Sequence, residues 1–480
     1  MKEKIKAFFK DKYNIAFLVI IVIAILTRLL WLDKFPAGIH EDEAGMMYDA
    51  YCMAEYGTDR YLNHNPVYLI NFGGGQSVLY AALASFFIRI FGFSLFVVRL
   101  PSFLFSILTI ILAFLLAKKF LGKKFALLFA FLITICPWHI MQARWGLDCN
   151  LFPSFIMLSL YAVLSAKKDW HYILAGICFG LTLYTYALSY ILIPVFFVAL
   201  AVYLIWVKKA TLKQIVIMLI PILILAFPLL WTQIINYLGK GTIDLGFITI
   251  PQLFQYRIGE VGFENVLYNL NITNYNNFFF LLFSAVNNPG FVLTEFGSIY
   301  FILVPFAIWG IILVARESIK SIKNKEFNLK TVIFLQFFTM SICILFFKNL
   351  QVHKLNALFI PLLFFCAEAI SWIYKKKKFF AYMIILSVTI TFVIFAQYYF
   401  KNINQKVGVE YNTDAIPLFH YLEENYPEKE IFLEIDAIAP YIYYLLATEM
   451  SPYEFMENMT MVQFMRRRCK RCPCGKLSFL

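Results

Sequence analysis

The sequence predicts an all-α protein that crosses a membrane many times, and three observations carry this prediction. Mean hydropathy is +0.72, and 61% of the residues are hydrophobic. The apolar runs are continuous over about 18 residues or more, which is the length that an α-helix needs to cross a bilayer. A membrane β-barrel would instead show alternating strands of about ten residues, so helices are favoured over strands.

The first apolar run, 15–32, follows a basic start at 1–12. This run is long for the apolar region of a signal peptide, and no small-residue cleavage site follows it. We therefore interpret it as a retained first span.

The basic residues carry information on topology. The formal net charge is +13, and most lysines stand in short clusters between apolar runs. Such clusters mark the cytoplasmic loops of a membrane protein, so the charge predicts orientation and argues against a nucleic-acid partner. We expect a multi-pass protein of the cell membrane with a cytoplasmic N-terminus.

Eleven apolar runs predict membrane spans. They are 14–32, 95–117, 124–141, 150–166, 170–187, 189–207, 214–231, 298–315, 331–347, 355–374 and 379–397. A further stretch, 77–92, is ambiguous because it is short, carries Arg89 and follows Gly73–Gly75. If it crossed the membrane, the lysines at 118–124 would lie opposite the basic N-terminus. We therefore predict that 77–92 is an interfacial helix within a first outer loop of 33–94.

This topology brings four separated segments to one outer face, where the unusual polar residues of the chain gather. They are 33–76, 142–149, 232–297 and 348–354.

The sequence also predicts three regions. Residues 1–397 form the transmembrane domain, and 398–465 form a small extracytoplasmic α/β region with helices at 411–426 and 439–448 and a strand at 431–435. The end, 466–480, is basic and has three cysteines within six residues, which are too few for a zinc site, so we expect a disordered tail. The six other cysteines are scattered singly and suit small core residues better than a disulfide framework.

The strongest functional candidate is the run His40, Glu41, Asp42 and Glu43 at the start of the first outer loop. Ionisable groups at a membrane edge are costly and tend to be functional. The alternative is electrostatic capping, since acids favour a helix N-terminus and a helix is predicted at 42–55. On that helix Asp42 and Glu43 point to different faces, so one can face a cavity and the other a neighbouring segment.

A second acid, Asp148, follows Arg144 in a short turn between two apolar spans. It is either the N-cap of the next helix or paired with Arg144, or it faces the same outer cavity as Asp42. The predicted topology favours the shared cavity.

Cations and aromatic hydroxyls complete the candidate site. Lys354 and His353 lie in an outer turn, where a cation opposes the positive-inside trend and suits a phosphate partner, although lipid headgroups would neutralise it as well. Tyr184 and Tyr186 suit a sugar ring, although an interfacial aromatic belt explains them equally well. A carboxylate can take a proton from an incoming hydroxyl while cations hold a departing phosphate, which indicates glycosyl or phosphoryl transfer from a lipid donor.

These motifs resemble the GT-C glycosyltransferases, and most closely the glycosyltransferase 39 group of protein O-mannosyltransferases and lipid A aminoarabinose transferases. The resemblance is good over about residues 10–200 and looser beyond. It rests on the following residues: Asp42 and Glu43, Gly92 to Ser94, Arg99 to Ser102, Pro137, Arg144 to Asp148, His353, Lys354, Asn356 and Pro361.

The resemblance implies an integral membrane enzyme that takes a sugar from a polyprenyl phosphate on the outer leaflet. Asp42 matches the catalytic base, Glu43 its neighbour and Asp148 the acid of the second loop, and we expect these three residues to be catalytic. Arg144 and Lys354 are then phosphate-binding candidates, with His353, Tyr184 and Tyr186 as further substrate contacts. The family also has an interfacial helix before its second span. A divalent metal suits the carboxylates, but the sequence shows no closed ligand set.

The acceptor stays open among a protein, a glycolipid and a cell-wall polymer. Two other functions compete with the transferase. A transporter or flippase of lipid-linked sugars would place charges near the midplane and often shows internal repeats, neither of which is evident. A non-catalytic scaffold would tolerate loss of the Asp42 carboxylate.

Overall fold

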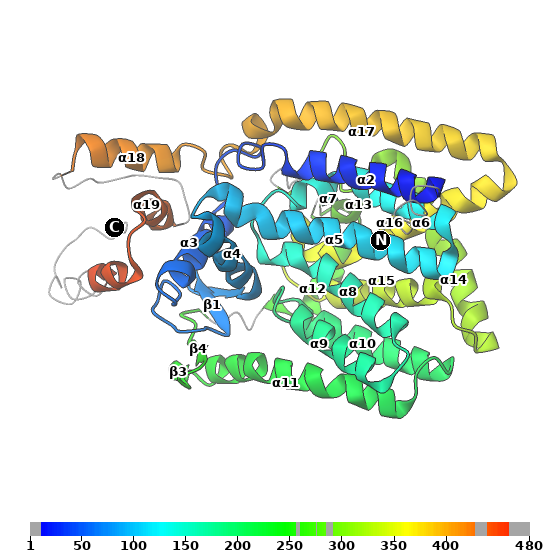
Figure 1. Cartoon of the computed structure of the whole chain (residues 1–480), viewed down its shortest axis with the longest axis horizontal. Helices are drawn as coiled ribbons and strands as arrows, with labels where there is room; N and C mark the ends of the chain where they lie inside the picture. The colour runs from blue at the N-terminus through cyan, green and yellow to red at the C-terminus, as the bar shows by residue number, and fades with distance from the viewer. Residues whose placement is uncertain (1–10, 256–259, 275, 285–290, 428–438, 460–480) are drawn as a thin grey trace, which may run out of the picture.

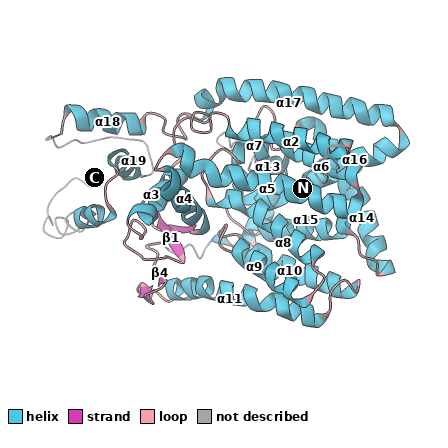
Figure 2. Cartoon of the chain, in the orientation of Figure 1, coloured by secondary structure: helices cyan, strands magenta, loops and turns pink. Residues whose placement is uncertain are grey.

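The computed structural model describes residues 11–255, 260–274, 276–284, 291–427 and 439–459. The described chain is an elongated bundle of helices, with two small hairpins of strands near one end (Figures 1 and 2). The predicted strand at 431–435 and the tail 466–480 lie outside the described residues.

Eight helices of the described chain are long and apolar enough to cross a membrane, which makes this a multi-pass membrane protein. They are α2 (Lys12–Leu29), α5 (Leu95–Leu121), α8 (Phe152–Ser165) with the preceding 3-10 turn η1 (Asp148–Leu151), α10 (Ser189–Trp206), α11 (Leu212–Tyr237), α14 (Val304–Asn324) with η3 (Phe301–Leu303), α16 (Asn356–Lys376) with η4 (Val352–Leu355), and α17 (Lys378–Val407).

Three further predicted spans are also helical but shorter. They are α6 (Lys123–Ile135), α9 (Asp169–Thr182) and α15 (Leu329–Leu345). The apolar run that contains α6 is broken at Pro137, where a short helix, α7 (Pro137–Gln142), begins. Proline lacks the N–H that a continuous helix would need there and suits a first turn instead.

Neighbouring helices approach closely where glycine faces the partner. A side chain at Gly176 or Gly180 of α9 would collide with Met218 or Leu225 of α11, and one at Gly310 of α14 would collide with the carbonyl of Phe365 in α16. Small residues four apart let two helix backbones meet, which matters in a membrane because lipid supplies no hydrophobic drive for association.

The long helices and the shorter α6, α9 and α15 together alternate in direction along the chain, so the loops gather at two ends of the bundle (Figure 1). One end, which we call the lysine end, carries the turns before α6, before α9, before α11, before α15 and before α17. The opposite end, the acidic end, carries α3 (Glu41–Glu55), α4 (Leu79–Phe91) and the hairpin β1–β2 (Tyr68–Asn71 and Gly74–Ser77).

The hairpin β1–β2 is held by a two-residue turn. Tyr68 pairs with Ser77 and Asn71 with Gly74, and both turn residues, Phe72 and Gly73, have positive φ (46° and 80°). This is the turn whose twist matches that of paired strands, and glycine adopts it without steric cost.

Helix α4 occupies the ambiguous stretch 77–92. It has 13 residues and packs against α3 and the start of α5 at the acidic end (Figure 1). One face is buried through Tyr80, Ala84 and Ile88, while Phe86 and Phe91 are exposed. This two-sided character is typical of a helix lying along an interface.

Two strands and two helices also lie toward the acidic end (Figure 1). They are β3 (Ile243–Asp244), β4 (Thr249–Ile250), α18 (Ala415–Asn425) and α19 (Tyr441–Thr448). Two short helices lie nearer the middle of that view: α12 (Glu264–Leu270), which contacts α15, and α13 (Phe278–Phe283), which contacts η4. Helices α18 and α19 correspond to the predicted helices 411–426 and 439–448.

The described C-terminal part packs directly on α3. The hydroxyls of Tyr48 and Tyr51 donate to the carbonyls of Met450 (2.7 Å) and Glu449 (2.9 Å), and the hydroxyl of Tyr443 donates to the carbonyl of Ile39 (2.9 Å). The start of α3 is therefore held from the outside by a segment about 400 positions later in the chain.

Candidate active site

The structure brings Asp42 and Asp148 to one place through the hairpin β1–β2. The side-chain amide of Asn71 in β1 donates to Asp42 Oδ1 (3.4 Å), and the backbone N–H of Ser77 in β2 donates to Asp148 Oδ2 (3.0 Å). The negative charge of Asp42 acts electrostatically on Asp148. The two acids of the predicted outer cavity are thus neighbours at the acidic end.

Each acid is also fixed by its own backbone surroundings. Asp42 lies in the first turn of α3, where His40 Nδ1 accepts a hydrogen bond from its N–H (3.2 Å). Asp148 begins η1, and its Oδ1 accepts from the N–H of Cys149 (2.7 Å). Asp42 keeps partial exposure, whereas Asp148 is buried, so Asp42 is the carboxylate that a substrate reaches more easily.

Glu43 points away from Asp42 and binds the neighbouring segments. Its carboxylate accepts from Nε and Nη2 of Arg99 (2.7 and 2.8 Å) and from the backbone N–H of Gly146. Both side chains of this ion pair are fully buried. Glu43 therefore ties α3 to α5 and to the loop that carries Asp148.

The side chain of Arg144 forms hydrogen bonds with backbone carbonyls. Its guanidinium donates to the carbonyls of Thr27, Leu30, Trp31 and Phe35 at 2.7–3.0 Å, and so caps the C-terminus of α2. The last carbonyls of a helix lack an intrahelical partner, and a buried cation stabilises them. Its predicted contact with phosphate stays a prediction.

Of the other predicted substrate contacts, His353 and Tyr186 lie near the two acids, whereas Tyr184 does not. The ring of His353 in η4 lies 6.2 Å from that of Tyr186, and the charges of Asp148 and Asp42 act on Tyr186. Burial, followed by the electrostatic effects of Cys149, Asp148 and Asp42, raises the pKa of Tyr186 well above its usual value. Tyr184 points elsewhere, because its hydroxyl donates to the carbonyl of Leu225 in α11 (2.8 Å).

Lys354 follows His353 in η4, and its Nζ donates to the carbonyl of Lys348 (3.0 Å). It lies on the partly exposed side of this turn, at the acidic end of α16. The structure thus brings Asp42, Asp148, Tyr186 and His353 together and places Tyr184 outside the group.

One site residue was missed by the sequence interpretation, namely Ser77, whereas Tyr190 belongs to the predicted aromatic turn. The backbone N–H of Ser77 donates to Asp148, and the Ser77 side chain acts on Tyr190 through a hydrogen bond. His353 Nδ1 is a buried atom without a hydrogen-bond partner in the described part of the chain. Buried polar atoms are nearly always paired, so this unpaired atom suits a polar ligand. The signal for Ser77 in the sequence was the flexible Gly73–Gly75 run before it.

The first turn of α3 carries a group that titrates near physiological pH. Burial, and then the charge of Asp42, raise the pKa of Glu41 to about 7. Burial lowers the pKa of His40, whose ring packs against Trp145 (5.2 Å between centroids) and Tyr411 (5.8 Å). Neutral His40 therefore serves as an acceptor for the Asp42 N–H.

The described residues contain no group of three or more His, Cys, Asp or Glu side chains that could hold a metal ion. Asp42 and Asp148 offer carboxylate oxygens, which magnesium and calcium prefer, but two such side chains are an incomplete ligand set.

Comparison with known proteins identifies the relatives of this chain. Residues 76–232 match the family described as dolichyl-phosphate-mannose-protein mannosyltransferase. No curated protein sequence matches the chain.

Two solved membrane proteins share the fold. ArnT from Cupriavidus metallidurans in the apo state has a TM-score of 0.53 and 11% identity, over 90% of this chain and 74% of its own. The Archaeoglobus fulgidus oligosaccharyltransferase, in complex with Zn and sulfate, has a TM-score of 0.52 and 15% identity over 90% of this chain. This chain spans 61% of the length of that archaeal protein.

A further structure shows ArnT from Cupriavidus metallidurans bound to undecaprenyl phosphate, and it matches with a TM-score of 0.51 and 10% identity. At these identities the likeness shows the fold. The resemblance to the GT-C glycosyltransferases is confirmed: the chain has their fold, and its residues 76–232 carry the sequence pattern of the dolichyl-phosphate-mannose-protein mannosyltransferase family.

Proposed function

We propose that this protein is a membrane glycosyltransferase that moves a sugar from a polyprenyl phosphate to an acceptor hydroxyl at its acidic end. The observation that carries the proposal is the pair Asp42 and Asp148, held side by side by one hairpin. The family match over 76–232 and the undecaprenyl phosphate bound by ArnT support the donor class.

Asp42 acts as the general base. It is the more accessible acid, and its carboxylate is free to take the proton of the acceptor hydroxyl while the hydroxyl oxygen attacks C1 of the sugar. The bond between C1 and the phosphate oxygen breaks, and the electron pair leaves with the polyprenyl phosphate. Attack opposite the leaving group inverts the configuration at C1.

The other residues bind and orient. Asp148, with Ser77 and Tyr190 beside it, faces the sugar, because carboxylates and hydroxyls can exchange hydrogen bonds with sugar hydroxyls. The departing phosphate gains negative charge, and a cation nearby stabilises it. Lys354 and His353 at the start of α16 are the candidates for this contact. Arg144 instead holds the C-terminal end of α2 and the loop that follows it.

Glu43 is a positioning residue in this mechanism. It is fully buried and bonded to Arg99 and Gly146, so it sets the relation between α3 and the loop of Asp148. The catalytic role expected for it from the resemblance is therefore replaced in our proposal by support of Asp42.

The proposal includes the membrane topology. Eleven helices cross the membrane, namely the eight long ones together with α6, α9 and α15, and α4 lies along the interface. The lysine end faces the cytoplasm, and the acidic end faces outward. Residues 1–397 form the catalytic domain, and 398–465 form a region that braces α3 from the outer side.

Transfer of radiolabelled sugar from a polyprenyl-phosphate donor tests the proposal. With purified protein, Asp42→Asn should lower turnover by about 100-fold or more, the usual contribution of a general base. Among the described residues, Asp42 accepts one long side-chain hydrogen bond, from Asn71, so the variant should keep its fold. The matched control is Asp33→Asn, an exposed carboxylate of the same outer loop, which should retain wild-type turnover within about twofold.

Full turnover by Asp42→Asn would refute the general base. Movement of intact donor across proteoliposomes without sugar transfer would instead favour the flippase.

A further inference from the structure

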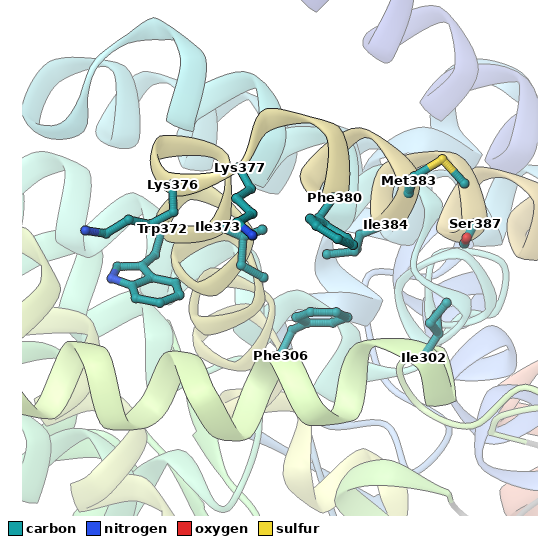
Figure 3. Close-up of a pocket in the computed structure, with 10 residues that line it drawn as sticks. All are labelled: Ile302, Phe306, Trp372, Ile373, Lys376, Lys377, Phe380, Met383, Ile384 and Ser387. Atoms are coloured by element: carbon teal, nitrogen blue, oxygen red, sulfur yellow. The ribbon is translucent and has the colours of Figure 1, made fainter.

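An open groove lies between α17 and the pair α14 and α16, away from the proposed active site. Its volume is about 580 Å³, and ten residues line it (Figure 3). On α17 the lining residues Phe380, Met383, Ile384 and Ser387 recur at helical spacing, so one face of the helix is turned to the groove. Phe306 of α14 lies across from Phe380. The walls are apolar over most of their length.

One mouth of this groove is basic. Lys376 ends α16, and Lys377 joins it to α17, and both line the groove and are exposed. No ion pair connects either lysine to a carboxylate of the described residues, and Lys377 Nζ lies 5.9 Å from the centroid of the Phe380 ring. Two unneutralised ammonium groups above an apolar channel complement a molecule with an anionic head and a hydrocarbon tail.

The groove lies at the lysine end, whereas a sugar donor that reacts at Asp42 must bind at the acidic end. Asn356, at the first turn of α16, donates to the carbonyl of Cys149 beside Asp148 (3.1 Å). Lys376 lies at the other end of the same helix, which at 1.5 Å per residue is about 30 Å away. A phosphate bound at Lys376 therefore belongs to a molecule other than the one that reacts at Asp42.

Helix α17 lies at the edge of the bundle (Figure 1). Only 17% of its most apolar window is buried, against 78% for that of α16, although the two helices are consecutive. The groove is the space that separates α17 from the bundle, and its volume lies within the usual range of about 300–1,000 Å³ for ligand sites.

We propose that this groove binds an anionic glycerophospholipid from the leaflet at the lysine end. One acyl chain lies between α17 and α14, and the phosphate contacts Lys376 and Lys377. The lipid fills the gap behind α17 and fixes that helix to the bundle. This site is independent of the transferase reaction, because it lies at the opposite end of α16.

Native mass spectrometry of the detergent-solubilised full chain tests the site. Phosphatidylglycerol, phosphatidylcholine and undecaprenyl phosphate are titrated separately into wild type, into Lys376→Gln/Lys377→Gln and into Lys375→Gln/Lys378→Gln. The second pair removes the same charge from flanking lysines that do not line the groove. We expect phosphatidylglycerol to bind at least tenfold more weakly to the first variant and within twofold of wild type to the second.

A variant that keeps all charges gives a second test. Ile384→Trp fills the groove and should also weaken phosphatidylglycerol binding at least tenfold. Equal losses in the two lysine variants would overturn the site in favour of a general basic patch, and so would unchanged binding in Ile384→Trp. Equal binding of phosphatidylcholine, or loss of undecaprenyl phosphate instead of phosphatidylglycerol in the first variant, would overturn the identity of the lipid.

Discussion

Glu43 and Arg99 show how a single buried pair can arrange a site without touching its substrate. The guanidinium of Arg99 also donates to the carbonyls of Leu32, Pro36 and Gly38. These hydrogen bonds fix the loop that precedes α3. Both side chains of the pair are fully buried. Burying two charges is costly, and such a pair is better suited to fixing one arrangement than to adding stability.

Removing one partner of this pair should be severe. Glu43→Gln leaves Arg99 as an uncompensated buried cation, and we expect a loss of about 3–5 kcal/mol in the free energy of unfolding. Glu41→Gln, two positions earlier and half-buried, serves as the control and should cost far less. Thermal unfolding in detergent measures both. A Glu43→Gln protein as stable as wild type but inactive would mean that Glu43 acts in the chemistry itself.

Glu41 should make stability depend on pH. Burial raises its pKa from 4.5 to about 7, so the folded protein holds this proton more tightly than the unfolded chain does. The resulting stabilisation is complete below pH 4.5 and is lost as pH rises through about 7. Unfolding temperatures measured from pH 5.5 to 8.5 should therefore fall more steeply for wild type than for Glu41→Gln. Parallel curves would contradict the raised pKa.

At the scale of elements, the pair α9 and α11 depends on glycine. A side chain at Gly176 meets the backbone of Met218 and the ring of Pro221, neither of which can turn aside. Gly176→Ala should therefore destabilise the protein by about 1–3 kcal/mol, the usual cost of overpacking. Gly241→Ala is the control, because no atom lies within 4 Å of its added methyl group. Equal unfolding temperatures for the two variants would show that α9 can shift freely.

The hairpin β1–β2 is the element that creates the proposed site. Its two strands hold one acid each, through Asn71 and Ser77, and α19 holds α3 from the other side through Tyr443. Short strands of this kind have no stability of their own and form only against a supporting surface. The acids therefore stay adjacent only while the whole acidic end is assembled.

At the scale of the whole molecule, the position of α4 decides the topology. If α4 lies along the interface, His64 and Ser94 are on the same side of the membrane, and Lys167 is on the other. Single cysteines at these exposed positions, in protein whose Cys469, Cys472 and Cys474 are replaced by serine, can be labelled with an impermeant maleimide. We expect His64→Cys and Ser94→Cys to react from one side and Lys167→Cys from the other.

The six remaining native cysteines are buried or half-buried, so they should contribute little label. Labelling of His64→Cys and Ser94→Cys from opposite sides would mean that α4 spans the membrane. The lysine clusters would then lie on both faces of the membrane.

The sequence by itself determined the class of the protein, the position of nearly every helix and the end at which the acids lie. These properties are local, because an apolar run of sufficient length becomes helical in lipid whatever its neighbours are. The predicted helix at 42–55 is α3, which begins one residue earlier, and the predicted interfacial stretch 77–92 contains α4. The short helices α6 and α9 are the exception, since their predicted spans, 124–141 and 170–187, run past the helix ends into residues that hydropathy does not distinguish.

Only the tertiary structure decided what each polar residue does. Arg144 and Lys354 have the same charge in the sequence, but Arg144 caps α2, whereas Lys354 stands at a partly exposed turn. Tyr184 and Tyr186 are two residues apart, and one faces α11 while the other faces the acids. Such roles depend on contacts between segments far apart in the chain, and these contacts exist only once the helices have packed.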